Sequence, residues 1–325
     1  MEWLDKDLAE KLSRLQAQSG PDADAERARL YHEAGTAARI DGRTDQARMA
    51  YTASMEIDIQ LGNRSGVAAT LFQLGGMARS DGDLAAASDY FAKSLDVSMA
   101  IENHKGAATL CHQLGSIAWT EGEFEKAASW FEDGYRLNEA LENTLGMATA
   151  CHQLARVARA QKDGDAAERW YKCAVPLFAA LDDDDMQAMS CHQLGLLAQK
   201  KGDMALAEDW YRQALALEEA SGDLAAQAST LGNLAMLAVD GNIRESAINW
   251  IVQANALFDT FPAPGAGQAP QQLALITGLY GETELKAGWR QVTGADLPAD
   301  LRAALPDLLA EQRPVIESMK AILSR

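Results

Sequence analysis

Small and apolar residues recur along the chain at a spacing of 40 residues. Within each 40-residue segment they lie three or four positions apart, which is the spacing of one face of an α-helix. Two columns hold alanine in all six segments, and a third holds leucine in five of them. Their members are Ala38, Ala78, Ala118, Ala158, Ala198 and Ala238; Ala47, Ala87, Ala127, Ala167, Ala207 and Ala247; and Leu74, Leu114, Leu154, Leu194 and Leu234. A self-match at a fixed period predicts a repeat protein.

Each segment is predicted to form two helices joined by a tight turn. In residues 68–107, Leu74 and Ala78 share one face of the first helix, and Phe91 continues the apolar face on the second. Between them, Gly82 can adopt the left-handed conformation that ends a helix, and Asp83 supplies an oxygen that caps the next one. The pair recurs as Gly202–Asp203, in the variants Gly122–Glu123 and Gly241–Asn242, and displaced as Gly164–Asp165.

This pattern resembles the tetratricopeptide repeat. With Ala68 as position 1, the family's Leu-Gly pair falls on Leu74 and Gly75, its small residue at position 20 on Ala87, and its aromatic residue at position 24 on Phe91. The usual repeat has 34 residues; six are added here, and we expect them to lengthen the second helix. The long repeat resembles the branch found in kinesin light chain and in bacterial peptide-sensing regulators. The resemblance implies an all-α fold, a right-handed α-solenoid of six helix–turn–helix repeats.

We expect helical caps at both ends of the solenoid, because the outer faces of terminal repeats need covers. An amphipathic stretch carrying Trp3, Leu4, Leu8, Leu12 and Leu15 predicts an N-terminal capping helix within residues 1–27. A stretch rich in proline and glycine predicts a linker over 262–270, and residues 271–325 are expected to form a C-terminal helical cap. The repeats between them are expected at 28–67, 68–107, 108–147, 148–187, 188–227 and 228–261.

The chain is strongly acidic, and this narrows the range of partners. It has 47 acidic and 29 basic residues, for a net charge of −18. Nucleic acids and anionic membrane surfaces are bound through lysine and arginine, so we expect neither as a partner. The N-terminus carries acidic residues where a signal peptide is basic and then apolar. We therefore expect a cytoplasmic protein.

Charge is nevertheless distributed unevenly between the two helices of each repeat. The expected first helices (28–40, 68–80, 108–120, 148–160, 188–200 and 228–240) contain only Glu33 and Asp240 as acids. Their basic residues are Arg29, Arg39, Arg79, Arg156, Arg159 and Lys200. This asymmetry favours a ligand with acidic or neutral side chains.

The family resemblance also implies where a ligand would bind. Positions 5 and 6 of the first helix line the concave groove in the family, and here they hold mostly histidine and glutamine. Side-chain amides can both donate to and accept from an extended peptide backbone, as an asparagine ladder does in the long-repeat relatives. Alternatively, the amides bond neighbouring helices and only tie the stack together. The candidate residues are Gln73, His112, Gln113, His152, Gln153, Arg156, Arg159, His192, Gln193, Lys200 and Asn233.

Adjacent Cys and His residues raise the possibility of zinc. They occur as Cys111–His112, Cys151–His152 and Cys191–His192, at equivalent points of successive repeats. Packed helices lie about 8–10 Å apart, whereas two ligands of one zinc ion lie within about 4 Å of each other. We therefore expect no metal site and no cofactor, and the cysteines are interpreted as small buried core residues.

No phosphate-binding loop or pairing of a nucleophile with a base is found, so the chain is not expected to be an enzyme. The first hypothesis is a non-catalytic adaptor that holds a partner polypeptide in the groove of the solenoid. The alternative is a sensor, in which a ligand or peptide alters the solenoid and thereby a partner protein. The identity of the partner and the oligomeric state stay open.

Overall fold

The computed structural model describes residues 6–16, 18 and 20–323. This part of the chain is built from helices and contains no strand. It divides into two compact units, Met1–Asp163 and Gly164–Arg325. Helices that follow one another in sequence pack together within each unit, which confirms the all-α helical solenoid expected from the 40-residue period.

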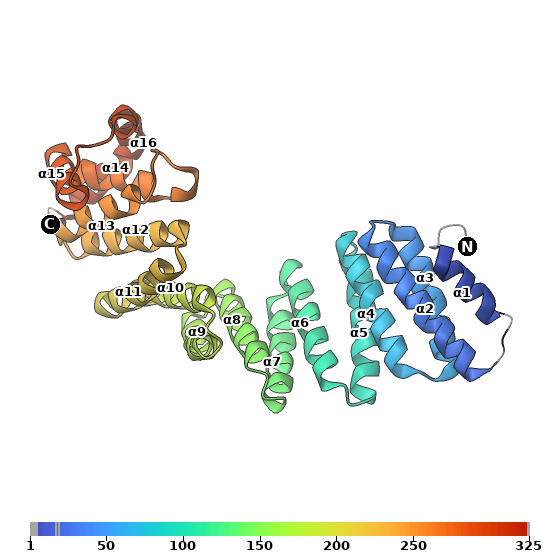
Figure 1. Cartoon of the computed structure of the whole chain (residues 1–325). Helices are drawn as coiled ribbons and strands as arrows, with labels where there is room; N and C mark the ends of the chain where they lie inside the picture. The colour runs from blue at the N-terminus through green and yellow to red at the C-terminus, as the bar shows by residue number, and fades with distance from the viewer. Residues whose placement is uncertain (1–5, 17, 19, 324–325) are drawn as a thin grey trace. The chain divides into compact units, whose positions relative to one another are not determined.

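The first unit contains three helical hairpins, flanked by one helix on each side. The hairpins pair α2 with α3, α4 with α5 and α6 with α7, and each helix from α1 to α8 packs on the next one along the chain (Figure 1). Leu12, on α1, is fully buried, whereas Trp3 and Leu4 of the expected capping helix lie outside the described residues. The helices are α1 (Lys6–Gln16), α2 (Pro21–Ile40), α3 (Thr44–Leu61), α4 (Arg64–Ser80), α5 (Leu84–Ala100), α6 (His104–Thr120), α7 (Phe124–Ala140) and α8 (Thr144–Ala160).

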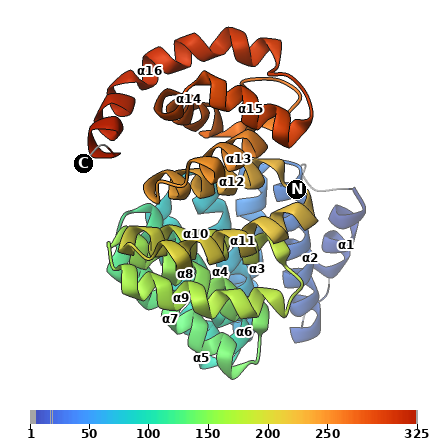
Figure 2. The ribbon, with the colours of Figure 1, turned by 90° about the vertical axis from the view of Figure 1, so that its left-hand side faces the viewer.

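The second unit continues with hairpins and ends in three helices outside the 40-residue period. The hairpins pair α10 with α11 and α12 with α13; α14 and α15 then pack on α13, and the long helix α16 packs on α14 (Figure 2). The short helix η1 lies within the stretch expected as a linker. The elements are α9 (Gly164–Ala179), α10 (Asp184–Lys201), α11 (Met204–Ser221), α12 (Leu224–Asp240), α13 (Arg244–Ala256), η1 (Pro264–Ala266), α14 (Ala269–Tyr280), α15 (Glu282–Thr293) and α16 (Ala299–Leu323).

The first helix of each repeat starts earlier than the sequence pattern indicated. We expected starts at residues such as 68 and 108, with the six added residues in the second helix. Instead α4 and α6 begin four residues sooner, at Arg64 and His104. Asparagine side chains fix these starts, because Asn63 and Asn103 accept hydrogen bonds from the backbone N–H of Gly66 and Gly106. Such a cap satisfies an amide that the helix itself leaves unbonded. The added residues therefore lengthen both helices.

The turn between the two helices lies at the same position of every repeat, even where the sequence has its glycine at another position. Gly82, Gly122 and Gly202 adopt the left-handed conformation at equivalent positions. In the fourth and sixth repeats that conformation belongs to Lys162, with φ of 63°, and Asn242, with φ of 55°, and not to the nearby glycines. Gly164 of the displaced pair instead begins α9, and Gly241 of the variant pair has a negative φ. The packing of the helices on either side sets the turn, and a residue other than glycine accepts the strain.

Side chains of very different size meet between the two helices of a repeat. The alanines at the position of Ala118 are all at most 7% exposed, and those at the position of Ala127 are fully buried. In several repeats glycine stands three positions before the first of these alanines, and there an aromatic ring of the second helix approaches the first helix closely. A Cβ atom added to Gly115 would lie 2.7 Å from Cε1 of Phe131, and Gly75 and Gly195 meet their rings in the same way. Because glycine has no side chain, the first helix leaves room for the aromatic ring of the second helix.

The buried alanine column gives a test of this packing. Ala118→Leu should lower the free energy of unfolding by about 1–3 kcal/mol, because added methylene groups overpack a filled core. Chemical denaturation followed by circular dichroism measures the change. Ala85→Leu is the matched control, since Ala85 is exposed on α5 and should tolerate the larger side chain. Equal stability of the two variants would contradict the helical register.

Candidate functional site

Two of the predicted amides, Gln73 and Gln113, lie in one hollow of the first unit. The hollow has a volume of about 500 Å³ and is also lined by Phe72, Arg39 and Arg79. Its residues come mainly from α4, with Arg39 from α2 and Gln113 from α6. The one carboxylate at its edge, Asp81, is paired with Arg48 at 2.9 Å. The hollow therefore presents two amides and a net positive charge.

Arginines hold some of these amides in place. Arg79 on α4 donates to Oε1 of Gln113 on α6, so this contact links two successive first helices. On α8, Arg156 donates to Oε1 of Gln153 at 2.9 Å. The same guanidinium lies over the ring of Trp119 on α6, 4.9 Å from its centroid, where a cation is attracted to the aromatic face. Arg79 and Arg156 thus join neighbouring first helices and line the same surface as the amides.

The structure places His112 and Gln113, which adjoin in sequence, in different hollows. His112 is half-buried with its ring 5.7 Å from that of Phe131, and it lines a different hollow, of about 230 Å³, which Gln113 does not reach. His152 is 5% exposed. Burial, with Arg156 and Arg159 adding to it, lowers the pKa of His152 to about 4. Burial lowers the pKa of both histidines, so they are neutral at neutral pH, and His112 packs beside the aromatic residue of position 24 in its repeat, Phe131.

Charge on the first helices is distributed differently from the sequence-based expectation. The longer observed helices α2 and α10 take in acidic residues, among them Asp184 and Asp185. Helices α4, α6 and α8 contain none, and they carry five basic residues: Arg64, Arg79, Lys105, Arg156 and Arg159. Arg159 is exposed, as is Lys200 on α10, where two acids offset it. The acid-free surface therefore belongs to the first unit.

In the second unit, two predicted residues join a buried chain of hydrogen bonds. Asn233 donates from Nδ2 to Nε2 of His192 at 3.1 Å. Because Nε2 accepts, Nδ1 carries the proton and donates to Oγ1 of Thr230 at 2.7 Å. Thr230 in turn donates to Oε1 of Glu218 at 2.9 Å. These hydrogen bonds link α10, α11 and α12. They are what is expected if the polar columns bond neighbouring helices and hold the stacked repeats together.

Glu218 and Thr230 were not among the residues selected from the sequence. Glu218 is only 4% exposed, and burial raises the pKa of its carboxyl to about 7, with Asp223 and Glu219 adding to the effect. One signal could have identified it. Glu218 follows Tyr211, Ala214 and Leu215 on the buried face of α11, at the spacing of a single helical stripe. A carboxylate in such a stripe lies in the core.

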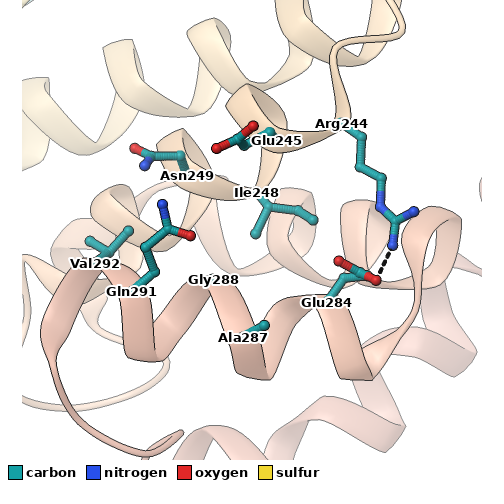
Figure 3. A pocket seen from close by; sticks show the side chains of 9 residues that line it. All are labelled: Arg244, Glu245, Ile248, Asn249, Glu284, Ala287, Gly288, Gln291 and Val292. Carbon is teal, nitrogen blue, oxygen red and sulfur yellow. Dashed lines mark ion pairs between the residues drawn. The ribbon is translucent and has the colours of Figure 1, made fainter.

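A further hollow, of about 410 Å³, lies between α13 and α15 (Figure 3). Gly288 on α15 allows Ile248 to approach closely, since an added Cβ atom would lie 2.3 Å from Cγ2 of that isoleucine. Arg244 and Glu284 form an ion pair across one end, while Asn249 and Gln291 face one another at the other. None of the residues selected from the sequence lines this hollow.

Two further findings concern the part of the chain that the structure describes. Within it, no group of three or more His, Cys, Asp or Glu side chains could hold a metal ion. The helices there include none that is long and apolar enough to cross a membrane. Cys111 and Cys191 are buried with free thiols, and burial raises the pKa of both to about 11.

The repeat pattern and the packed hairpins agree with a known family. The model of the tetratricopeptide repeat matches residues 26–100, 66–140 and 146–219, which together make up more than half of the chain. The chain belongs to the tetratricopeptide repeat family. This confirms the family expected from the sequence, and the architecture is that of a protein-interaction scaffold. No curated protein is significantly similar to the chain in sequence.

Solved structures share this fold at low sequence identity. A signal transduction ATPase with a tetratricopeptide repeat sensor from Pyrococcus horikoshii has a TM-score of 0.62 at 10% identity, over 89% of this chain and 46% of that one. Aspartyl phosphate phosphatase F from Bacillus subtilis has a TM-score of 0.53 at 13% identity, over 82% and 70%. BtubC from P. vanneervenii has a TM-score of 0.50 at 20% identity, over 78% and 91%.

Glu218 predicts a specific dependence of stability on pH. Its pKa is about 7 in the folded chain, against an ordinary value of 4.5, so folding favours the protonated form. Its contribution to stability is therefore fully present below about pH 4.5 and is lost as the pH rises through about 7. Relative to the native chain, Glu218→Gln should gain about 3 kcal/mol of unfolding free energy between pH 4.5 and 8.

Denaturation curves of both proteins at several pH values measure this difference. Comparing variant with native protein cancels the opposite trend from His192, whose pKa burial lowers to about 4. Glu219→Gln is the control, because Glu219 is exposed beside Glu218 on the same helix. A stability difference for Glu218→Gln that does not change with pH would show that this carboxyl ionises normally.

Proposed function

We propose that the chain is a non-catalytic adaptor that holds an extended segment of a partner protein against α4, α6 and α8. The observation that carries the proposal is the surface of these three helices, which is free of acids in a chain of net charge −18. A scaffold that used its helices only for stacking would not need such a surface. The partner segment is expected to have acidic or neutral side chains.

The hollow beside Gln73 and Gln113 is the part of this surface that fits a peptide. Its volume of about 500 Å³ falls within the range of ligand sites. The two amides can donate to and accept from a peptide backbone, and Phe72 in the same hollow offers an apolar contact. Arg79 and Arg39 would pair with a carboxylate of the bound segment through their fixed fork of N–H groups.

The spacing of the helices sets the length of the bound segment. Packed helices lie about 8–10 Å apart, and an extended chain rises about 3.3 Å per residue. A segment crossing α4, α6 and α8 therefore needs about six residues. One amide per repeat, at Gln73, Gln113 and Gln153, would then meet every third residue of the peptide backbone.

Selection from a library of short peptides tests the proposal directly. The full chain should enrich acidic and neutral sequences over basic ones, and the affinity should fall as salt screens the charges. Arg79→Glu should weaken the selected peptides by about tenfold or more, because a charge-assisted hydrogen bond is replaced by repulsion. Arg136→Glu is the charge-matched control, since Arg136 is exposed on α7 and pairs with Glu132 and Asp133.

A second variant separates binding from stacking. Gln73→Ala combined with Gln113→Ala should weaken the peptides by about tenfold and leave the melting temperature nearly unchanged. Enrichment of basic peptides, or equal affinity for the native chain and Arg79→Glu, would overturn the proposal. A double variant that melts earlier yet binds normally would assign the amides to stacking alone.

A further inference from the structure

The first and third repeats share a part-buried hydrogen bond at the junction between one hairpin and the next. In the first repeat, Asn63 donates from Nδ2 to Oδ1 of buried Asp58 at 2.7 Å. In the third, Asn143 donates to Oδ1 of buried Asn138 at the same distance. Each asparagine also accepts a backbone N–H with its own oxygen and so caps the following helix. The amide therefore donates one hydrogen bond and accepts another, whereas a carboxylate could only accept.

The fifth repeat has a carboxylate at both of these positions. Asp223 caps α12, since its Oδ1 accepts from the backbone N–H groups of Ala225 and Ala226 at 3.0 Å. Its side chain has no N–H to give to the carboxyl of Glu218, which occupies the place of Asp58 and Asn138. Oε1 of Glu218 is satisfied by Thr230, but Oε2 is buried without a hydrogen-bond partner among the described residues. An unpaired buried carboxylate oxygen is costly.

A hollow of about 270 Å³ opens beside this carboxylate, between α10, α11 and α12. Glu218, Asp223 and Asp185 line it, and no lysine or arginine does. His192 lines it as well but stays neutral, because its Nε2 accepts from Asn233. Ser221 and Ser229 add hydroxyl groups, and Met189 adds an apolar wall. The hollow therefore has three carboxylates and no basic residue to balance them.

We propose that this pocket binds an organic ammonium group, whose N–H groups supply the donor that Oε2 of Glu218 lacks. An ammonium carries three donors in different directions, which suits one buried carboxylate oxygen together with Asp223 and a serine hydroxyl. The flat fork of a guanidinium would instead need two free oxygens side by side. A metal ion does not fit, since the acids here do not converge as a metal site requires. The volume suits a small alkylamine or a single lysine side chain.

This site is independent of the peptide surface in the first unit. Its residues lie on α10, α11 and α12, and none of them is changed in the variants that test the adaptor. The same ammonium chemistry could come from a free alkylamine or from a lysine of a partner protein. Failure of one proposal therefore leaves the other standing, and the two sources of the ammonium can be told apart by the probe that binds.

Calorimetric titration of the full chain at pH 8 tests the pocket with two probes. Butane-1,4-diamine represents a free amine, and Nα-acetyl-lysine amide represents a lysine side chain; butane-1,4-diol is the uncharged control. At least one ammonium probe should bind while the diol does not. Glu218→Gln should weaken that binding by about tenfold to a hundredfold, because a charged hydrogen bond is lost. Glu219→Gln, which removes the neighbouring exposed charge, should bind like the native chain.

Asp223→Asn gives a second test, which leaves the carboxylate of Glu218 in place. The new amide should keep the helix cap, as Asn63 and Asn143 do, and donate to Oε2 of Glu218. It should therefore weaken the ammonium probe by about tenfold or more while raising the melting temperature. The proposal is overturned if neither probe binds at about 10 mM, if Glu218→Gln binds as tightly as the native chain, or if the diol binds equally well.

Discussion

Close contact between a glycine and an aromatic ring joins the two helices of the hairpins α2–α3, α4–α5, α6–α7 and α10–α11. Where glycine occupies this position, as at Gly75 and Gly115, the ring of Phe91 or Phe131 lies directly against the backbone of the first helix. The buried alanine columns on both helices allow the same close approach along their length. Because the two helices are fixed at short range, the polar residues between them have fixed neighbours. The hollows of both units follow from this geometry.

Equivalent positions in different repeats carry side chains with different hydrogen-bonding groups and charge. The hollow beside His112 and the hollow beside His192 occupy the same register, two repeats apart. The first contains Asn143, which donates to the side-chain oxygen of Asn138. The second contains Glu218 and Asp223, which cannot. Two substitutions of an amide by a carboxylate thus turn a neutral, self-satisfied junction into a charged pocket, while the fold around it is retained.

Electrostatics also differ between the first helices of the two units. Helices α4, α6 and α8 lack acids, whereas α10 begins with Asp184 and Asp185. Arginines on the acid-free surface bind glutamines and an aromatic ring, so they are oriented before any ligand arrives. Preoriented side chains lose less conformational freedom on binding. The same bonds explain why a polar column can stabilise the stack and still present a surface to a partner.

The sequence alone determined the family, the period and the buried columns, because packing between adjacent helices must repeat whenever the chain does. It placed Ala78 and Phe91 on the apolar faces of their helices without reference to coordinates, and both are buried. It did not determine where each helix begins, since a cap such as Asn63 lies outside the apolar pattern. It grouped His112 with Gln113, which the structure separates, because neighbouring residues on a helix point about 100° apart. The hydrogen bonds of Glu218 were decided only by tertiary structure, since its partners come from another helix and its missing donor is visible only once Asp223 lies beside it.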